Sequence, residues 1–467
     1  MVIVAAGQVN LTIQKGLKMN KLKLVTLIGS TLLFTACGGG GGSNDSGGAG
    51  GGGTGGGSNT VTLSADIVQE TLCLTEIPAT HAELVVYDDN WAIKSRHKPD
   101  AQGKITATIP TTQFVNIALI TQAETSTGTR TYIQSRAQHP VGDLGKFYAA
   151  GTSASNCECT TKDIQASSIQ GMTSSRITLI GATDRVPFQQ TSTYSGVFRD
   201  VQICRTPGGS WPALTVLNSQ STELAAGSLN NYDINTELEI QLDKFATYYP
   251  INVDTNFNNL RITHEIEANM LSTTFAPGSI EAPVITELDT LTRTHLSGTY
   301  FYQVTENNQS VNVFAGHRKA VNFAQSDTPS LPMPDMSPLE GLAAAFDNFI
   351  SSDSTSYSIP HANQYAMFSI RADISLMDGS EYTEVFYGPM QGKYPENALP
   401  EDYNMEDKLE TASDIYLELT LTKYASETNY QSALKGIVKK SRVDDADIFG
   451  GEWSDYSYVS IAADLTL

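Results

Sequence analysis

The segment Ile415-Tyr416-Leu417-Glu418-Leu419-Thr420-Leu421-Thr422 alternates apolar and polar residues. Successive side chains of a β-strand point to opposite faces, so this period of two predicts a strand with one buried face and one face toward water. The segment Tyr365–Ile374 repeats the pattern, with Phe368 and Ile370 at apolar positions. Both segments are typical of antiparallel sheets that pack on one side only.

Shorter segments of the same kind recur along the chain at Glu83–Tyr87, Lys104–Ile109, Phe114–Thr121, Arg176–Ile180, Glu237–Leu242, Ser297–Thr305 and Tyr456–Leu465. Turn residues such as Asp378-Gly379 and Pro207-Gly208-Gly209 separate the apolar segments. We therefore predict an all-β fold, with mainly antiparallel sandwich or barrel-like domains. One short amphipathic helix is expected near 338–350, because Pro338 stands at a helix start and Leu339, Leu342, Phe346, Phe349 and Ile350 follow at helical spacing.

The length of 467 residues predicts two or three domains. We place a β-sandwich at 60–150, a second β domain at 151–280 and a C-terminal β domain at 284–467, with a linker around Pro277-Gly278. The chain holds 29 Lys and Arg against 50 Asp and Glu, a formal net charge of −21. This balance argues against nucleic acid as a partner, because phosphate backbones require a cationic surface.

The start of the chain is rich in targeting signals. Met19-Asn20-Lys21-Leu22-Lys23 is basic, and the 13 residues Leu24–Ala36 are apolar but too few to cross a membrane as a helix. Residues 19–36 are therefore expected to be a signal peptide, and residues 1–18 to be untranslated or dispensable. Phe34-Thr35-Ala36-Cys37 resembles the lipobox of bacterial lipoproteins, which implies cleavage before Cys37 and acylation of that residue. The alternative is an ordinary signal peptide followed by a chance cysteine.

Glycine fills 14 of the 21 positions from Gly38 to Ser58, and none of the others is apolar and larger than alanine. Such a segment cannot bury enough surface to offset its ordering entropy, so residues 37–59 are expected to be a lipidated cysteine and a flexible tether. Gly38 after the cysteine resembles outer-membrane sorting. The lipoprotein resemblance thus implies an outer-membrane protein that is lipid-anchored and, in our interpretation, exposed at the cell surface rather than turned toward the periplasm.

Four cysteines remain, namely Cys73, Cys157, Cys159 and Cys204. An even number in an exported protein predicts two disulfides. Cys157 and Cys159 lie about 6.6 Å apart in an extended segment, too far for a mutual bond, so each is expected to pair with one of the distant cysteines. A metal site is the alternative, but the spacing fits zinc poorly.

Residues 82–120 read AELVVYDDNWAIKSRHKPDAQGKITATIPTTQFVNIALI, with a strand ending in Tyr87-Asp88 and the turn Asp100-x-x-Gly103-Lys104. This segment resembles the transthyretin-like or carboxypeptidase-regulatory β-sandwich. The resemblance implies a structural or binding module and no catalytic residue. From Val61 onward the sequence also lacks the GxSxG, GxxxxGK[ST] and GxGxxG fingerprints, so no catalytic motif is found and we expect a protein that is not an enzyme.

Two weak signals suggest ligands. Asp254, Asn256 and Asn258 with Glu265 place oxygens at the spacing of an EF-type calcium loop, although a strand after an Asn-rich turn explains the same residues. Calcium is the one cofactor considered; no other is expected. On the last predicted strand, Tyr456 and Tyr458 lie opposite the apolar residues and close to Trp453, where exposed aromatic rings can stack on sugars. Packing under a neighbouring loop is the alternative.

The sequence therefore favours a non-catalytic lipoprotein of the cell envelope that binds or adheres at the surface. A glycan-binding module for nutrient capture is the first alternative, and a periplasm-facing structural lipoprotein of envelope assembly is the second. The expected partners are the outer membrane, through the lipid, and a glycan or a surface protein.

Overall fold

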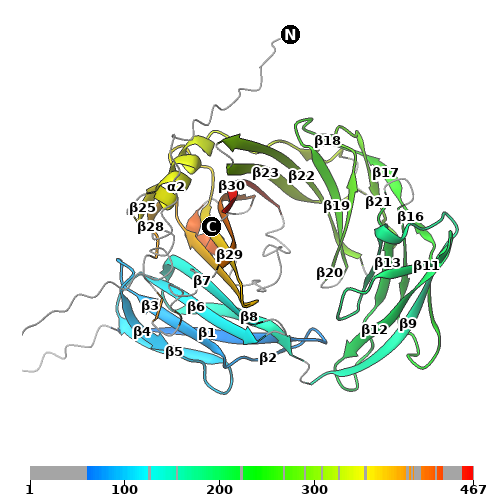
Figure 1. Cartoon of the computed structure of the whole chain (residues 1–467), viewed down its shortest axis with the longest axis horizontal. Helices are drawn as coiled ribbons and strands as arrows, with labels where there is room; N and C mark the ends of the chain where they lie inside the picture. The colour runs from blue at the N-terminus through cyan, green and yellow to red at the C-terminus, as the bar shows by residue number, and fades with distance from the viewer. Residues whose placement is uncertain are drawn as a thin grey trace, which may run out of the picture.

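The computed structural model describes residues 60–465 except 125–127, 154–155, 221–223, 267–268, 289–290, 307–308, 324–326, 352–354, 396–398, 401–402, 404–411, 426, 428 and 435–454. The predicted all-β fold is confirmed, because sheets form almost the whole of the described chain. Viewed down the shortest axis, the sheets are arranged as a ring (Figure 1). Within the described residues, no helix is long and apolar enough to span a membrane.

A 12-stranded sheet forms most of this ring. In spatial order it contains β20 (Asn269–Phe275), β19 (Asn259–Ile266), β22 (Leu291–Glu306), β23 (Gln309–Val321), β30 (Tyr456–Leu465), β29 (Ala412–Tyr424), β26 (Met367–Leu376), β27 (Glu381–Gly388), β7 (Thr129–Pro140), β6 (Phe114–Glu124), β3 (Ala82–Tyr87) and β4 (Ile93–His97). The alternating segment quoted first lies in β29, where Ile415, Leu417, Leu419 and Leu421 are buried. The period-two pattern therefore marks the centre of the largest sheet.

Strands from all three expected domain ranges pair within this one sheet. Its strands are antiparallel neighbours except at β27 and β7, which run parallel from Glu381 opposite Arg130 to Tyr387 opposite Arg136. Alternation along a strand indicates which side chains are buried but carries no information about the neighbouring strand. Pairing between residues about 250 positions apart was consequently beyond the reach of the sequence pattern.

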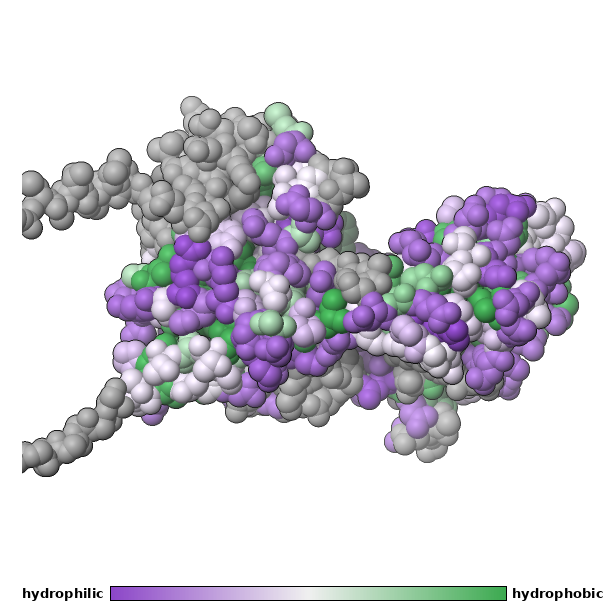
Figure 2. Space-filling model, turned by 90° about the horizontal axis from the view of Figure 1, so that it is seen from below, coloured by the Kyte–Doolittle hydropathy of each residue, from purple (hydrophilic) through white to green (hydrophobic). Residues whose placement is uncertain are grey.

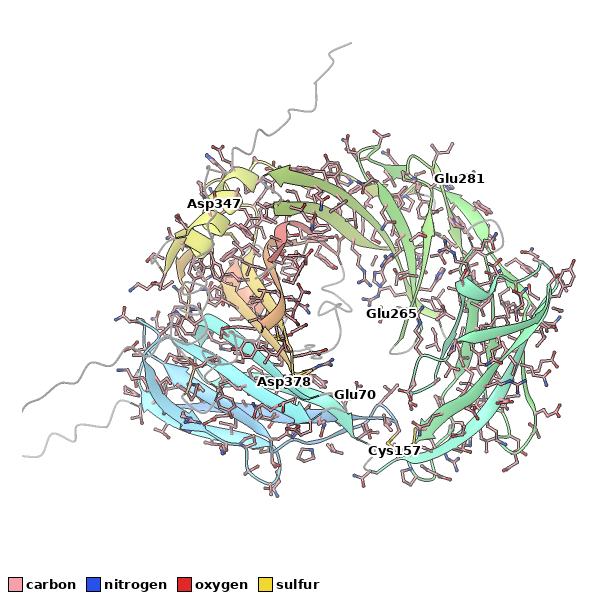
Figure 3. The ribbon with its side chains drawn as sticks, viewed as in Figure 1. Glu70, Cys157, Glu265, Glu281, Asp347 and Asp378 are labelled. Atoms are coloured by element: carbon pink, nitrogen blue, oxygen red, sulfur yellow. A yellow bond between two sulfur atoms is a disulfide. The ribbon has the colours of Figure 1, made fainter. Side chains whose placement is uncertain are left out.

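Helix α2 (Leu339–Ser351) lies in the predicted place and packs on β29 and β30. Leu339, Leu342, Phe346 and Phe349 are buried in the main hydrophobic core together with the apolar side of the large sheet. We call the side of the sheet that carries α2 the outer face, and the opposite side the inner face. In Figure 3, Asp347 of α2 lies on the outer rim of the ring, whereas Glu265 of β19 lies toward its centre.

A smaller sheet packs on the inner side of β3, β6 and β7. It contains β2 (Glu76–Pro78), β1 (Thr60–Thr71), β5 (Lys104–Pro110) and β8 (Asp143–Ser153), and its core includes Leu63, Leu84, Ile117 and Phe147. In the turn before β5, the Asp100 carboxylate accepts hydrogen bonds from the backbone N–H groups of Gln102 and Lys104, both at 2.9 Å. Gly103 has φ +74°, and a Cβ there would lie 2.3 Å from the Ile67 carbonyl oxygen, so only glycine fits this turn.

A second sandwich follows in the chain. One sheet contains β11 (Phe188–Ser192), β12 (Ser195–Arg205), β9 (Glu158–Ser168) and β15 (Leu238–Leu242), and the other contains β10 (Ile177–Ile180), β13 (Leu214–Asn218), β14 (Ala225–Leu229) and β16 (Lys244–Phe245). The short helix η1 (Ser174–Arg176) precedes β10. Two-stranded pairs complete the fold, namely β17 (Thr247–Pro250) with β21 (Glu281–Val284), β18 (Asn252–Val253) with β24 (Ser330–Leu331), and β25 (Ser356–Ser358) with β28 (Gln391–Lys393).

Two disulfides form, as predicted. Cys73 in the turn after β1 bonds to Cys157, with 5.8 Å between their Cα atoms, and thereby fastens the two sandwiches where the chain passes from one to the other (Figure 3). Cys159 of β9 bonds to Cys204 of β12, which lies directly opposite in the sheet. The expectation that neighbouring cysteines of the CxC pair reach different distant partners is confirmed.

The described surface is mainly polar. In Figure 2, hydrophilic residues cover most of the face that is drawn, and hydrophobic residues occur in small separate groups. The most exposed large apolar residues, Ile169, Ile280 and Met377, lie on different turns. Exposed apolar side chains that stand singly need no partner to explain them.

Candidate ligand-binding face

The inner face carries a row of polar side chains across four adjacent strands. Arg261 of β19 lies opposite Ser297 of β22, Ser297 lies opposite Arg318 of β23, and Arg318 lies opposite Tyr456 of β30. Leu260 and Ile262, on either side of Arg261, are fully buried on the outer face. Alternation along β19 therefore turns the Arg261 side chain inward, where it is exposed.

The next positions along the same strands place His295 beside this row. His295 and Glu265 both lie on the inner face, and Nε2 of His295 is 3.2 Å from an oxygen of Glu265. Burial lowers the pKa of His295 to about 4, and the positive charges of Arg318 and Arg293 act in the same direction against the hydrogen bond to Glu265. The imidazole is thus neutral at neutral pH, and its Nε2–H donates to the carboxylate.

Two tyrosines border the row on β30. The ring centroids of Tyr456 and Tyr458 are 6.3 Å apart and the ring planes are tilted by 34°. Tyr458 lies against the bare backbone of Gly316, where a Cβ would approach its Cε1 to 2.3 Å. Burial raises the pKa of Tyr458 above its ordinary value although a hydrogen bond with Thr299 opposes the shift. Both rings are partly accessible at the inner face.

We call the set Arg261, Arg293, Arg318, His295, Glu265, Ser297, Tyr456 and Tyr458 the inner arginine site. It contains three arginines and one carboxylate, in a protein with a formal net charge of −21. Arginine stays charged at any ordinary pH, so these strands bring three positive charges to this part of the inner face, with Arg261 exposed and Arg318 buried. Within a strongly acidic molecule, such a concentration can attract and orient an anion.

The rest of the inner face differs in its charge. Nε of Arg371 lies 2.6 Å from an oxygen of Asp373, and Nη2 of Arg130 lies 2.7 Å from an oxygen of Glu381. Thr383 also donates a hydrogen bond to Asp373 at 2.6 Å. These arginines are matched by carboxylates on β26 and β27, so this part of the inner face satisfies its own charges.

Beside these ion pairs, aromatic residues pack on β7, β27 and β29. The hydroxyl of Tyr430 donates to the carbonyl oxygens of Ala137 at 2.6 Å and Tyr387 at 2.9 Å. Tyr387 and Tyr424 pack in the same small cluster, and Tyr456 lies at its margin. Tyr456 is therefore shared between this cluster and the inner arginine site.

The structure does not bring the predicted calcium ligands together. Asp254 accepts two hydrogen bonds from Asn256 within a turn, and the Asn258 side chain pairs with the backbone of Phe301. Residues 259–266 then form the extended strand β19, which carries Glu265 about 20 Å from its start. A strand after an Asn-rich turn was the alternative interpretation, and it is the one observed. No cluster of three or more His, Cys, Asp or Glu suited to a metal occurs among the described residues.

Of the predicted glycan-stacking residues, the structure describes the two tyrosines but not Trp453. Tyr456 and Tyr458 lie opposite the buried Val459 and Ile461, as the alternation indicated. They are partly packed rather than freely exposed, since Tyr456 contacts Tyr424 with 6.4 Å between ring centroids. Trp453 and the expected lipidation residue Cys37 lie outside the described residues.

Sequence reasoning missed the arginines of the site. Arg261 alternates with buried residues in Leu260-Arg261-Ile262, which could have marked it as a side chain on the polar face of a strand. Its neighbours across the sheet are 36 and 57 positions away in the chain. These arginines lie close together because of the register between distant strands, and no local sequence pattern encodes that register.

No known protein family matches this chain, and a search of curated proteins finds no relative. A solved structure described as "Structure of the Streptococcal ancillary pilin" aligns with 59% of this chain and 98% of its own, at 8% identity. The TM-score of 0.12 is too low to support any conclusion about shared fold or function.

Proposed function

We propose that this protein is a non-catalytic lipoprotein of the outer membrane that binds or adheres at the cell surface. The observation that carries the proposal is the order of segments at the start of the chain, where an apolar leader, Cys37 and a glycine-rich stretch precede the folded body. The two disulfides support an extracytoplasmic location, because such bonds persist in oxidising compartments.

The anchor fits this role physically. Each buried CH₂ of an acyl chain contributes about 0.8 kcal/mol to membrane binding, so several chains on Cys37 would hold the protein durably. The glycine-rich stretch would let the body stand off by about 25 Å on average. The surface of the body is too acidic to adsorb directly on anionic lipids, so the covalent lipid would be its main hold on the membrane.

Mass spectrometry of the N-terminal peptide tests the anchor. We expect an acylated Cys37 in the membrane fraction and, for Cys37→Ser, loss of acylation and release of the body from membranes. A Cys37 that carries no lipid in the wild-type protein would contradict the proposal. Protease treatment of intact cells then tests orientation. Removal of the body supports surface exposure, and protection until lysis would favour the periplasm-facing structural role instead.

A glycan-binding module is the second candidate. It is supported by Tyr456 and Tyr458, which present partly accessible rings beside arginines and hydroxyl groups on the inner face. Aromatic rings next to polar side chains are a common means of holding sugars, because the ring covers the apolar face of the sugar and polar groups bind its hydroxyls. Loss of sugar binding in Tyr456→Ala would support this candidate, and unchanged binding would exclude Tyr456 from it.

A further inference from the structure

We propose that the outward face of the second sandwich binds a neutral glycan through uncharged amide and hydroxyl side chains. This inference rests on the glycan-binding candidate above, but it places the sugar on a different surface, whose side chains are open to solvent. It follows from the strand register of one sheet, from the charges on and beside its outward face, and from the exposure of a tyrosine at its end.

The sheet of β11, β12, β9 and β15 has one face toward solvent. Ile164 of β9 lies opposite Phe198 of β12 and beside Leu238 of β15, and all three side chains are buried in the sandwich core. The next residue of each strand therefore points away from that core. The other sheet of the sandwich packs toward β20, where Leu217 and Leu271 share a cluster. The outward face of the first sheet is thus turned away from the large sheet (Figure 1).

Two rows of side chains cross this outward face. Taken from β11, β12, β9 and β15 in that order, the first row is Gln189, Val197, Gln165 and Glu239, and the second is Ser192, Ser195, Ser167 and Gln241. Gln165 and Gln241 are exposed, and within the described part of the chain their amide groups have no hydrogen-bond partner. An amide offers both donors and an acceptor, so these two can bind neighbouring hydroxyl groups of a sugar.

The charges around the rows favour a neutral ligand. The sequence has no charged residue from Gln165 to Ser175 or from Val186 to Phe198. Beside the first row, Arg199 lies 2.9 Å from an oxygen of Asp163 and is therefore paired. Glu239 is the one charged residue in the two rows, and it accepts a hydrogen bond from Ser167 at 3.4 Å. An ionic ligand would find no surplus of opposite charge here, whereas a neutral sugar needs none.

Tyr194 stands at the end of the second row, in the turn between β11 and β12. Its backbone carbonyl accepts a hydrogen bond from the N–H of Ser168 at 2.9 Å, which ties the turn to the end of β9. The Ser192 hydroxyl accepts from the Tyr194 N–H at 3.1 Å and lies 2.8 Å from the Ser195 hydroxyl. The turn is therefore held in place while 56% of Tyr194 is exposed. An exposed ring on a fixed turn can cover the C–H face of a sugar at a low cost in ordering.

The same residues suit a glycan better than a protein partner. Stable protein interfaces bury about 800 Å² on each side around an apolar centre. Within the described part of the second sandwich, only Ile169 and Tyr194 are exposed large apolar residues. Hydrogen bonds to hydroxyl groups, together with one ring for stacking, match the composition of this face.

The test uses the full chain, purified with its anchor in a detergent that contains no sugar. Calorimetry measures the binding of cellohexaose, maltohexaose, mannohexaose and galactohexaose beside the acidic hexagalacturonate. We expect at least one neutral sugar to bind, and hexagalacturonate to bind about 10-fold more weakly, because the protein carries a net charge of −21. The affinity for the neutral sugar should change less than about 2-fold between low and high salt, because a contact without charges is not screened.

Variants locate the site, with circular dichroism as the check on folding. Tyr194→Ala should reduce the affinity for the neutral sugar about 10-fold. Its matched control is Tyr248→Ala on β17, which removes a ring of similar exposure, 50%, and should change the affinity less than about 2-fold. Gln165→Glu removes an amide donor and should reduce the affinity about 5-fold. Gln102→Glu makes the same change in the exposed turn before β5 and should leave the affinity unaltered.

The inference would be overturned if the folded chain bound none of the four neutral sugars, or if it bound hexagalacturonate as strongly as any of them. Equal losses from Tyr194→Ala and Tyr248→Ala would also overturn it. A loss in Tyr456→Ala with none in Tyr194→Ala would remove the sugar from this face and keep the glycan-binding candidate. None of these outcomes would alter acylation of Cys37, so failure here is distinguishable from failure of the proposed envelope function.

Discussion

The two faces of the large sheet are built from the same strands but differ in what their side chains do. On the outer face, apolar residues from β26, β27, β29 and β30 pack with α2 in one continuous core. On the inner face, the same strands and their neighbours carry arginines, carboxylates and tyrosines. The outer face therefore supplies most of the stability of this sheet. The inner face is less uniform, because part of it packs on the smaller sheet around Leu84 and Ile117, part carries the cluster of Tyr387 and Tyr424, and the rest is polar.

The two faces also differ in the charged side chains that they carry. On the outer face, Glu83 is held by two hydrogen bonds from Arg96, at 2.6 and 2.8 Å, whereas Glu384 is partly buried and accepts a hydrogen bond from Ser135. The inner face groups three arginines in one place. The outer face thus holds acidic side chains within the packed core, whereas this part of the inner face gathers guanidinium groups from neighbouring strands.

The largest expected effect is on the outer face. Phe386 is buried among Trp91, Phe368, Tyr357 and Tyr394, with ring centroids 5.9 to 6.5 Å away. Phe386→Ala should lower the free energy of unfolding by about 3–5 kcal/mol, since it removes a large apolar side chain and leaves a cavity. Urea denaturation measures this, with Tyr416→Ala on the inner face as the control. Equal losses from both variants would contradict the division between the faces.

The next effect depends on pH. Burial raises the pKa of Glu384 from 4.5 to about 7, so between these values the folded chain binds more protons than the unfolded chain. The Glu384 carboxyl therefore makes stability fall as pH rises through this window, by at most about 3 kcal/mol. Glu384→Gln should remove that fall. The stability of the variant relative to wild type, measured by thermal unfolding, should therefore increase from pH 5 to pH 8.

Glu83→Gln is the matched variant, and we expect its effect on stability to change with pH in the opposite direction. Burial favours a higher pKa for Glu83, but hydrogen bonds from Arg96 and Tyr403 outweigh it and hold the pKa below 4.5. The stability that this carboxylate contributes is therefore present above its unfolded pKa and lost as pH falls. The variant should be less stable than wild type at pH 7, and the deficit should shrink toward pH 3. Parallel pH profiles for the two variants would be inconsistent with this assignment.

A smaller effect is expected from the paired charges of the inner face. Arg371 and Asp373 have half and about a third of their side chains exposed, at 50% and 31%. Because ion pairs at such sites are screened by solvent, Arg371→Ala should lower the free energy of unfolding by only about 0–1 kcal/mol. A loss above 2 kcal/mol in urea denaturation would mean that the inner face supports the fold more than we infer.

The smallest effect on stability is expected at Arg261. Its side chain is exposed, so Arg261→Ala should change the free energy of unfolding by no more than about 0.5 kcal/mol. A loss above 2 kcal/mol in urea denaturation would reverse the roles that we give to the two faces.

Local patterns predicted much of this fold. Alternation placed Ile415 and Leu417 on the buried face, helical spacing placed Leu342 and Phe346 under α2, and the CxC spacing led to the two disulfides. Each of these features depends on residues close together in the chain or on the geometry of one bond. Such information is fully present in the sequence.

The features that the sequence did not reveal are non-local. The parallel pairing of β27 with β7 and the gathering of Arg261, Arg293 and Arg318 depend on strand order and register. The predicted calcium ligands lie apart for the same reason, because spacing alone could not tell a loop around an ion from the extended strand that holds Glu265. Only Tyr456 and Tyr458 of the inner arginine site could be nominated as exposed-face ligand contacts from their own strand.

The most direct test of the division between the faces is urea denaturation of Phe386→Ala on the outer face beside Arg261→Ala on the inner face. We predict that the free energy of unfolding falls by about 3–5 kcal/mol for Phe386→Ala and by no more than about 0.5 kcal/mol for Arg261→Ala. Equal losses from the two variants would contradict the claim that the packing of the outer face holds this sheet together.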